Sequence, residues 1–210
     1  MVRMKSEVRE KVMSQTRQTL LNAAAEEFSR QGYDQANINT ISIKAGFAKG
    51  TVYNYFPSKQ DLLKALIDSI AQEHLEYLRS AILSEDDPAI RLERFFHAGF
   101  EYVTSHFHRA RAMFNMVYSS NQEHKDFCFQ AYQPMFQLVA DQILLPGMQQ
   151  NIFRQAEPRS TAILLMTIYL GTASQVDEQG RPWLNPENVA DFVLHALRTV
   201  KETRSLGERR

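Results

Sequence analysis

The residues whose types and spacing could do chemistry lie in one short run, residues 49–55, with the sequence Lys-Gly-Thr-Val-Tyr-Asn-Tyr. An ammonium group, hydroxyls and a side-chain amide can bind phosphate oxygens and base edges, and a glycine lets backbone approach closely. The chemistry is therefore non-covalent binding of nucleic acid. The candidate DNA-binding residues are Asn37, Lys49, Gly50, Thr51, Tyr53, Asn54, Tyr55 and Lys59.

Two short helices must position these residues. Asn37 is a suitable N-cap for the first helix, which turns Ile38 and Ile41 inward and ends at Gly46. The second helix is expected at 49–56, with Val52 and Phe56 facing the core, and Pro57 stops it. Two helices of this size, joined by residues 46–48, have the spacing of a helix-turn-helix, in which the second helix enters the major groove.

Helical periodicity continues on both sides of this unit. A first helix is expected at 7–30, closed by Gly32, and Ser58 should cap a long helix at 59–83. Further helices are expected at 88–106, 109–119, 123–145 with a kink at Pro134, 158–178 and 186–204. The predicted fold is all-α. A three-helix DNA-binding domain (1–57) precedes a helical ligand-binding and dimerisation domain (58–210).

Charge is distributed unevenly along a chain of 210 residues whose net charge is zero. Residues 1–59 hold nine Lys/Arg and five Asp/Glu, a net of +4, so residues 60–210 carry −4. Such an asymmetry is expected if the first part alone meets phosphate. A single cysteine excludes an internal disulfide, and the absence of a leader or a membrane-spanning apolar run predicts a cytoplasmic protein.

The run at 41–59 resembles the signature of the TetR family of transcriptional regulators. The match includes Ala-Gly at 45–46, Lys-Gly-Thr at 49–51, Tyr-x-Tyr-Phe at 53–56 and Ser-Lys at 58–59, and it extends over residues 17–66. The resemblance implies a dimer, an inducer-binding C-terminal domain, and contacts to bases or phosphates from residues 49–51, 53–55 and 59. Ala48 departs from the usual serine, and this substitution removes a cap and a candidate phosphate contact.

The middle of the chain, residues 95–136, is rich in aromatic residues and methionine, which suit an adaptable apolar pocket, although an ordinary core explains any single one of them. Few charges accompany them, so a small hydrophobic ligand is expected. Arg91, Arg94, Arg109 and Arg111 could serve an anionic headgroup, although solvated helix faces are the commoner explanation. The candidate ligand-binding residues are Phe95, Phe100, Phe107, Met113, Phe114, Met116, Phe127, Tyr132, Phe136, Met166 and Tyr169.

A metal site is considered and not expected. His124 and Cys128 are spaced i, i+4 and share a helix face, with His106 and His108 earlier in the chain, but no paired-cysteine or HExxH spacing supplies a closed ligand set. Cys128 lies between two phenylalanines and is expected to be buried and unreactive. No metal or cofactor is therefore predicted.

The helices expected at 158–178 and 186–204 are apolar on more than one face, and they predict a homodimer formed through both. The leading hypothesis is a repressor that is released from a palindromic operator by a hydrophobic inducer. An enzyme is the first alternative, but no nucleophile–base pair, metal spacing or phosphate loop supports it. A constitutive DNA-binding protein without a ligand is the second, and a steep salt dependence without a ligand response would distinguish it.

Overall fold

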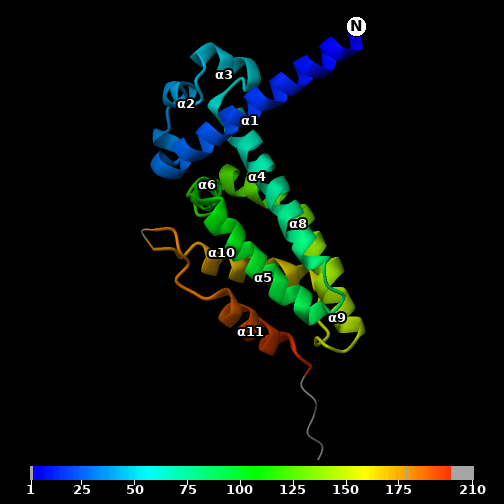
Figure 1. Ribbon diagram of the computed structural model, residues 1–210. Coiled ribbons are helices and arrows are strands. Elements are labelled where there is room, and N and C mark those ends of the chain that lie inside the picture. The colour runs from blue at the N-terminus through cyan, green and yellow to red at the C-terminus, as the bar shows by residue number, and fades with distance from the viewer. Residues whose placement is uncertain (1, 178, 200–210) are drawn as a thin grey trace, which may run out of the picture.

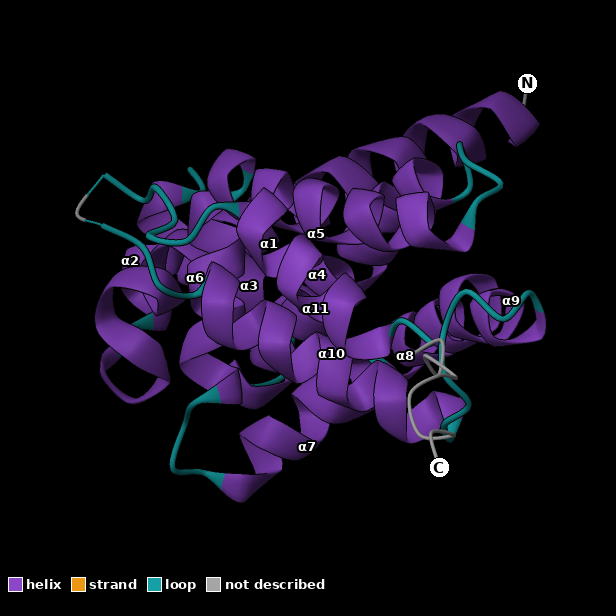
Figure 2. Ribbon diagram, turned by 90° about the horizontal axis from the view of Figure 1, so that it is seen from below, coloured by secondary structure: helices purple, strands orange, loops and turns teal. Residues whose placement is uncertain are grey.

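The computed structural model describes the backbone of residues 2–177 and 179–199, and the side chains from residue 6 onward (Figure 1). This part of the chain is helical and contains no strand (Figure 2). The helices are α1 (Val2–Gln35), α2 (Ile38–Lys44), α3 (Lys49–Tyr55), α4 (Lys59–Ile82), α5 (Pro88–Ser105), α6 (Phe107–Val117), α7 (Gln122–Ala131), α8 (Gln133–Val139), the π-helical turn η1 (Ala140–Leu144), α9 (Leu145–Gln149), α10 (Pro158–Ala173) and α11 (Pro186–Leu197). None of these helices is long and apolar enough to cross a bilayer.

Helices α1–α3 form the part of the molecule that we call the head. Leu20, Ala24 and Phe28 are fully buried along one side of α1, as their spacing predicted, and they pack with Ile41 of α2 and Val52 of α3. These apolar contacts fix the angle between the two short helices. The head therefore presents α3 as a rigid element.

The residues that begin and end the helices of the head are those predicted from the sequence, with one difference. Asn37 caps α2 by accepting a hydrogen bond from the Asn39 amide at 2.8 Å. Gly32 has a φ of +70° and breaks the regular geometry of the first helix where expected, but helical residues resume after it and continue to Gln35. The glycine therefore kinks the end of α1 instead of ending it.

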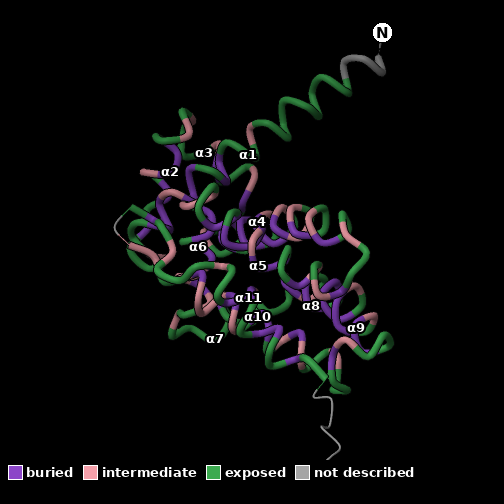
Figure 3. Tube along the Cα trace, turned by 60° about the horizontal axis from the view of Figure 1, so that its bottom comes forward, coloured by how far each residue is buried: buried purple, intermediate pink, exposed green. Residues whose placement is uncertain are grey.

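Helix α4 connects the head to the body, which comprises α4–α11. Ser58 Oγ accepts a hydrogen bond from the Asp61 amide at 3.1 Å and starts α4 at the predicted residue. Leu62, Leu66 and Ile70 are buried along its inner face. Helix α5 packs between α4 and α11, and Figure 3 colours the buried residues along the chain.

The single helix expected at 123–145 is wrong, because the chain forms four shorter elements there. Helix α7 ends at Ala131, the Tyr132 amide still donates to Cys128 O, and Pro134 then occupies the first turn of α8. A proline in the first turn loses no hydrogen bond, whereas inside a helix its ring would clash with the preceding turn. The chain therefore restarts at this proline.

Two other helices are shorter than predicted. Helix α10 ends at Ala173, and beyond it the chain turns back, because Asp177 accepts from Arg181 N and Trp183 N donates to Gln175 O. Helix α11 ends at Leu197, whose carbonyl accepts from Arg154 N in the loop after α9. The remainder of the predicted 186–204 helix, residues 200–204, lies outside the described residues.

Candidate DNA-binding surface and ligand pocket

The turn between α2 and α3 is held by its own backbone. Gly46 has a φ of +75°, a conformation that a side chain would strain, and Phe47 N donates to Ser42 O at 2.9 Å. Ala48 precedes α3 without a side-chain capping bond, as the departure from serine implied. The free amides at the start of α3 are therefore open to another acceptor, such as a phosphate oxygen.

The outer face of α3 carries most of the predicted DNA-binding residues. Lys49, Gly50, Tyr53 and Asn54 are exposed, whereas Thr51 and Tyr55 are half-buried. Lys49 Nζ lies 5.9 Å from the Tyr53 ring centroid, and nothing lies within 4 Å of where a Gly50 Cβ would be. Val52 and Phe56 face the core, with 1% and 3% of their surface exposed, as predicted.

The two outlying candidates have partners within the head. Lys59 Nζ donates to Asp34 O at 3.1 Å and lies 4.7 Å from the Tyr33 ring centroid, so it braces the end of α1. Asn37 is exposed, but its side-chain oxygen is engaged in capping α2. An ammonium has three donors and an amide has a free NH₂ group, so each could still reach a phosphate.

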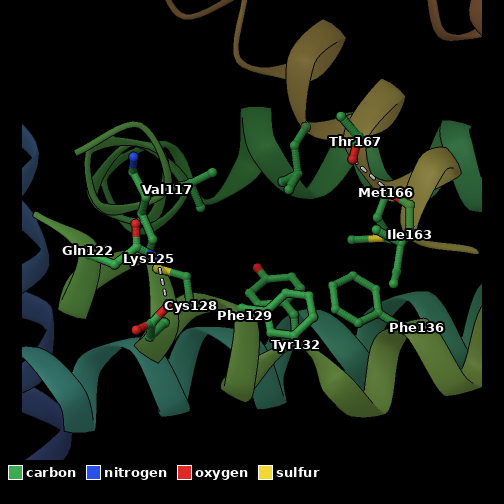
Figure 4. Close-up of a pocket in the computed structure, with 12 residues that line it drawn as sticks. Val117, Gln122, Lys125, Cys128, Phe129, Tyr132, Phe136, Ile163, Met166 and Thr167 are labelled. Carbon is green, nitrogen blue, oxygen red and sulfur yellow. Dashed lines mark hydrogen bonds between the residues drawn. The ribbon is translucent and has the colours of Figure 1, made fainter. Parts of the chain in front are cut away.

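A hollow of about 320 Å³, partly open to the surface, lies between α7, α8 and α10, close to the end of α6 (Figure 4). The predicted residues Tyr132, Phe136 and Met166 line it. Its complete lining is Val117, Gln122, Lys125, Asp126, Cys128, Phe129, Tyr132, Phe136, Ile163, Met166, Thr167 and Leu170. We call this hollow the α7–α10 pocket.

The other predicted ligand-binding residues do not meet in that pocket. Phe107 and Phe114 line a second hollow, of about 750 Å³, between α6 and residues 174–177. Phe100 lies beside a third, of about 860 Å³, between α5 and residues 182–186. Met113 and Tyr169 border a void of about 10 Å³ in the interior. Phe95 and Met116 are core residues, and Phe127 packs half-buried against Lys64 of α4.

Several pocket residues were missed by the sequence prediction. Lys125 and Phe129 precede Tyr132 and Phe136 at helical spacing, so the four form one stripe along α7 and α8. Ile163, Thr167 and Leu170 follow the same spacing on α10. The helical spacing of these residues was the signal in the sequence that could have identified the pocket wall, whereas a high content of aromatic residues does not show which of them share a face.

A buried polar chain begins at the wall of the pocket. Tyr132 Oη lies 3.0 Å from Nδ1 of His74, a residue of α4 that sequence reasoning did not single out. His74 Nε2 lies 3.2 Å from Tyr169 Oη, which donates to Gly99 O at 3.0 Å. Burial lowers the pKa of His74 to about 3, with a smaller contribution from the charge of His106. The imidazole is therefore neutral at physiological pH, and Tyr102 stacks on it with ring centroids 4.2 Å apart.

Helix α6 ties the head to the body through polar contacts. Arg109 is buried, and its guanidinium binds Glu73 at 2.9 Å and Ser69 at 2.8 Å on α4, and Asn22 at 3.2 Å on α1. Asn115 Nδ2 donates to Phe28 O at 3.1 Å. A movement of α4 or α6 would therefore displace α1 or break these contacts.

The four arginines considered for an anionic headgroup have other partners. Arg109 is held as above, and Arg91 donates to the carbonyls of Glu85 and Gln142. Arg94 pairs with Glu85 at 3.1 Å beside the third hollow. Arg111 lies over the Phe107 ring beside the second hollow. None of the four lines the α7–α10 pocket, where Lys125 is the cation.

His124 and Cys128, the i, i+4 pair named for a metal in the sequence, are both buried. His124 is buried edge-on against Tyr33, with ring centroids 4.6 Å apart. Burial raises the pKa of Cys128 to about 12, so its sulfur is a thiol at neutral pH. No group of three or more His, Cys, Asp or Glu residues that could hold a metal occurs in the part of the chain that the structure describes.

Comparison with known sequences matches the head to one family. Residues 20–66 match the sequence model described as bacterial regulatory proteins, tetR family. A Bacillus subtilis protein named uncharacterized HTH-type transcriptional regulator YvdT is 37% identical over 68 residues, which cover 32% of this chain and 35% of that protein. That alignment thus spans about a third of the relative. Another from the same organism, YhgD, is 20% identical over 181 residues, covering 83% of this chain and 90% of the relative.

Comparison with solved structures extends the likeness to the body. The transcriptional regulator FadR from Bacillus subtilis, solved with stearoyl-CoA, has a TM-score of 0.74 at 20% identity, covering 85% of this chain and 95% of FadR. AibR, solved with isovaleryl coenzyme A and operator DNA, has a TM-score of 0.69 at 18% identity, covering 87% of this chain and 97% of AibR. At these identities the likeness shows a shared fold of helix-turn-helix head and helical body.

Proposed function

We propose that this chain, a transcriptional regulator of the TetR type by its helix-turn-helix domain, is a repressor that a small hydrophobic inducer releases from its operator. Residues 1–57 would bind DNA, and residues 58–210 would bind the ligand and a second copy of the chain. The observation that carries the proposal is the exposed polar face of α3, set on a buried apolar face that fixes its orientation. No membrane or metal takes part in it.

The DNA contacts we propose are those of the outer face of α3. Tyr53 and Asn54 point away from the core and would meet base edges or phosphates, while the Lys49 ammonium, the Gly50 amide and the Thr51 hydroxyl would meet the DNA backbone at the start of the helix. Asn37, Tyr55 and Lys59 would add phosphate contacts at the edges of the groove. Because Gly50 adds no bulk, the helix can lie close to the DNA.

We propose a homodimer formed through α10 and α11, and the two-fold symmetry of such a dimer would match a palindromic operator. Leu164 on α10 and Phe192 on α11 are 58% and 69% exposed, although their neighbours Leu165 and Val193 are buried. Apolar side chains on both faces of a helix are explained by a partner on the outer face. A symmetric pair would place its two α3 helices about 34–36 Å apart, one turn of DNA.

The α7–α10 pocket is the ligand site we propose, with Tyr132, Phe136 and Met166 in its wall. Its volume of about 320 Å³ is at the lower end of the usual range for small-molecule sites, so a compact apolar ligand fits best. FadR and AibR were solved with acyl-CoA molecules, and for this reason thioesters with a short acyl chain, whose acyl portion alone would enter a pocket of this volume, are the first class of ligand to test. Lys125 is the cation available for an anionic portion of such a ligand.

Release from DNA would follow from a movement of α4. A ligand that displaces Tyr132 changes its hydrogen bond to His74 on α4, and only three residues separate the end of α3 from the start of α4. A ligand that prefers the displaced arrangement lowers DNA affinity by its differential binding to the two states.

The test is a mobility shift of the purified protein on its own upstream intergenic DNA at physiological salt. Saturable binding that Tyr53→Ala abolishes and a hydrophobic ligand relieves is the expected result. Tyr118→Ala is the matched control, because Tyr118 is 59% exposed and lies in the body, directly after α6. Binding with no response to any ligand would point to a constitutive DNA-binding protein, and no binding beyond the level of Tyr53→Ala would contradict the proposal.

A further inference from the structure

The first turns of α1 stand clear of the rest of the molecule (Figures 1 and 3). We call residues 2–19 the N-terminal arm. Its described side chains are exposed from residue 6 to residue 19, with Thr16 alone half-buried, and Leu20 is the first buried residue of the helix. At about 1.5 Å per residue, the arm is about 27 Å long. It precedes the region that matches the family, which begins at residue 20.

The arm holds most of the basic excess of the head. Residues 1–19 contain five Lys/Arg and two Asp/Glu, a net of +3, out of the net of +4 carried by residues 1–59. Residues 20–59 contain four Lys/Arg and three Asp/Glu, so they contribute only +1. The positive charge first noticed in the sequence therefore belongs mainly to the arm and not to the helix-turn-helix.

The side chains of the arm are arranged in strips. Val8 and Val12, spaced i, i+4, form an apolar strip that is 60% and 54% exposed. At 100° per residue, Lys11 and Arg9 flank this strip on its two sides, and Glu10 lies on the opposite face. An exposed helix that packs against nothing else is marginally stable alone, so a binding partner would stabilise it.

We infer that the N-terminal arm is a second DNA-binding element, which contacts the phosphate backbone beside the groove that α3 enters. Its charge complements a polyanion, and it lies at the same end of the molecule as α3, continuous with the head (Figure 1). A second copy of the arm is a poorer occupant, because joining two apolar strips would bring the flanking Arg9 and Lys11 of both copies together. The inference rests on the proposed DNA binding and extends its footprint.

The test compares the full-length Arg9→Gln/Lys11→Gln variant with wild-type protein on the upstream fragment and on a scrambled duplex, by fluorescence anisotropy over a range of salt. A dimer that loses two phosphate contacts per copy should show a slope of log K against log salt that is shallower by about 2 to 4. The preference for the upstream fragment over the scrambled one should persist, because phosphate contacts carry no sequence information. Hydroxyl-radical protection should shrink at the outer edges of the site.

Arg79→Gln/Arg94→Gln is the matched control, since it removes the same charge from α4 and α5 of the body, where both side chains are about half exposed. Its slope should equal that of wild-type protein. An arm variant with an unchanged slope would overturn the inference while leaving the proposed function intact. Wild-type protein that binds neither duplex would refute the proposed function itself. If the slope is unchanged but the arm variant loses binding to anionic vesicles, the arm is a membrane-binding element instead. If the slope is unchanged but the variant loses the mass of a dimer, the arm takes part in assembly.

Discussion

Tyr132 and His74 join the α7–α10 pocket to the helix that leads to the head. The Tyr132 ring lines the pocket, while its hydroxyl lies 3.0 Å from Nδ1 of His74 in the middle of α4. Because Tyr169 Oη donates to Gly99 O, it must accept from His74 Nε2, and Nδ1 is then left to accept from Tyr132. Each member of the chain from Tyr132 to Gly99 is satisfied by one arrangement of hydrogens.

Replacing Tyr132 with phenylalanine tests this link. The ring would keep the pocket wall, but the acceptor of His74 would lose its donor in the interior, at a cost of about 1–3 kcal/mol in the free energy of unfolding. We expect operator binding to persist and the ligand concentration needed for release to change. Denaturant unfolding and the mobility shift measure the two effects. Tyr118→Phe removes an exposed hydroxyl and should change the unfolding free energy by less than about 0.5 kcal/mol.

The depressed pKa of His74 predicts acid sensitivity. The pKa is about 3 in the folded protein and near 6.5 when the chain is unfolded, so between these values the unfolded state binds the extra proton. This contribution to stability is complete above about pH 6.5 and decreases by up to about 1.4 kcal/mol per pH unit as pH falls through the window. Denaturant unfolding from pH 4.5 to 7.5 should show a steeper loss for wild-type protein than for His74→Gln. The exposed His195 provides a control, because His195→Gln should retain the wild-type slope.

Replacing Gly99 with a larger residue is predicted to destabilise the protein, because the site has no room for a side chain. A Cβ at this position of α5 would lie 2.5 Å from Cε2 and 2.9 Å from Cζ of Tyr169, a fully buried ring. Gly99→Ala should push this ring off His74 and lower the unfolding free energy by about 1–3 kcal/mol. Gly171 of α10 has nothing within 4 Å of its Cβ position, so Gly171→Ala should stabilise the protein by about 0.4–1 kcal/mol. We expect the midpoint of thermal unfolding to fall for Gly99→Ala and to rise for Gly171→Ala, and equal shifts of the two midpoints would contradict this prediction.

The head could be predicted almost completely from the sequence, because its boundaries depend on local signals. Gly32 and Gly46 adopt positive φ, Asn37 and Ser58 cap helices, and Pro57 lies beyond the end of α3, as their residue types indicate. The end of α7 at Ala131 was not predicted, because a proline inside a long apolar pattern is compatible with a kink or with a new helix. Tertiary packing of α8 and η1 against α10, and of η1 against α5, favours the new helix.

The site in the body could be predicted only in part. Aromatic content indicates a core and a pocket equally, and the structure divides the predicted set between one pocket, two other hollows and plain core. His74 was missed because a lone histidine on a long helix looks like a surface residue. Its position in the buried stripe with Ile70 and Leu78, four residues on either side, was the available signal.

The outer faces of the last two helices lead to the final prediction. Phe192 is 69% exposed on α11, with Val193 buried beside it, so a charge at position 192 should disturb association without disturbing the core. We expect Phe192→Glu to reduce the sedimentation mass from dimer to monomer and to weaken operator binding at least tenfold, because one α3 then reads one half-site. Leu83→Glu introduces the same charge at a 46% exposed apolar position at the end of α4 and should leave both mass and binding unchanged. A Phe192→Glu protein that remains dimeric would show that α11 is not the interface.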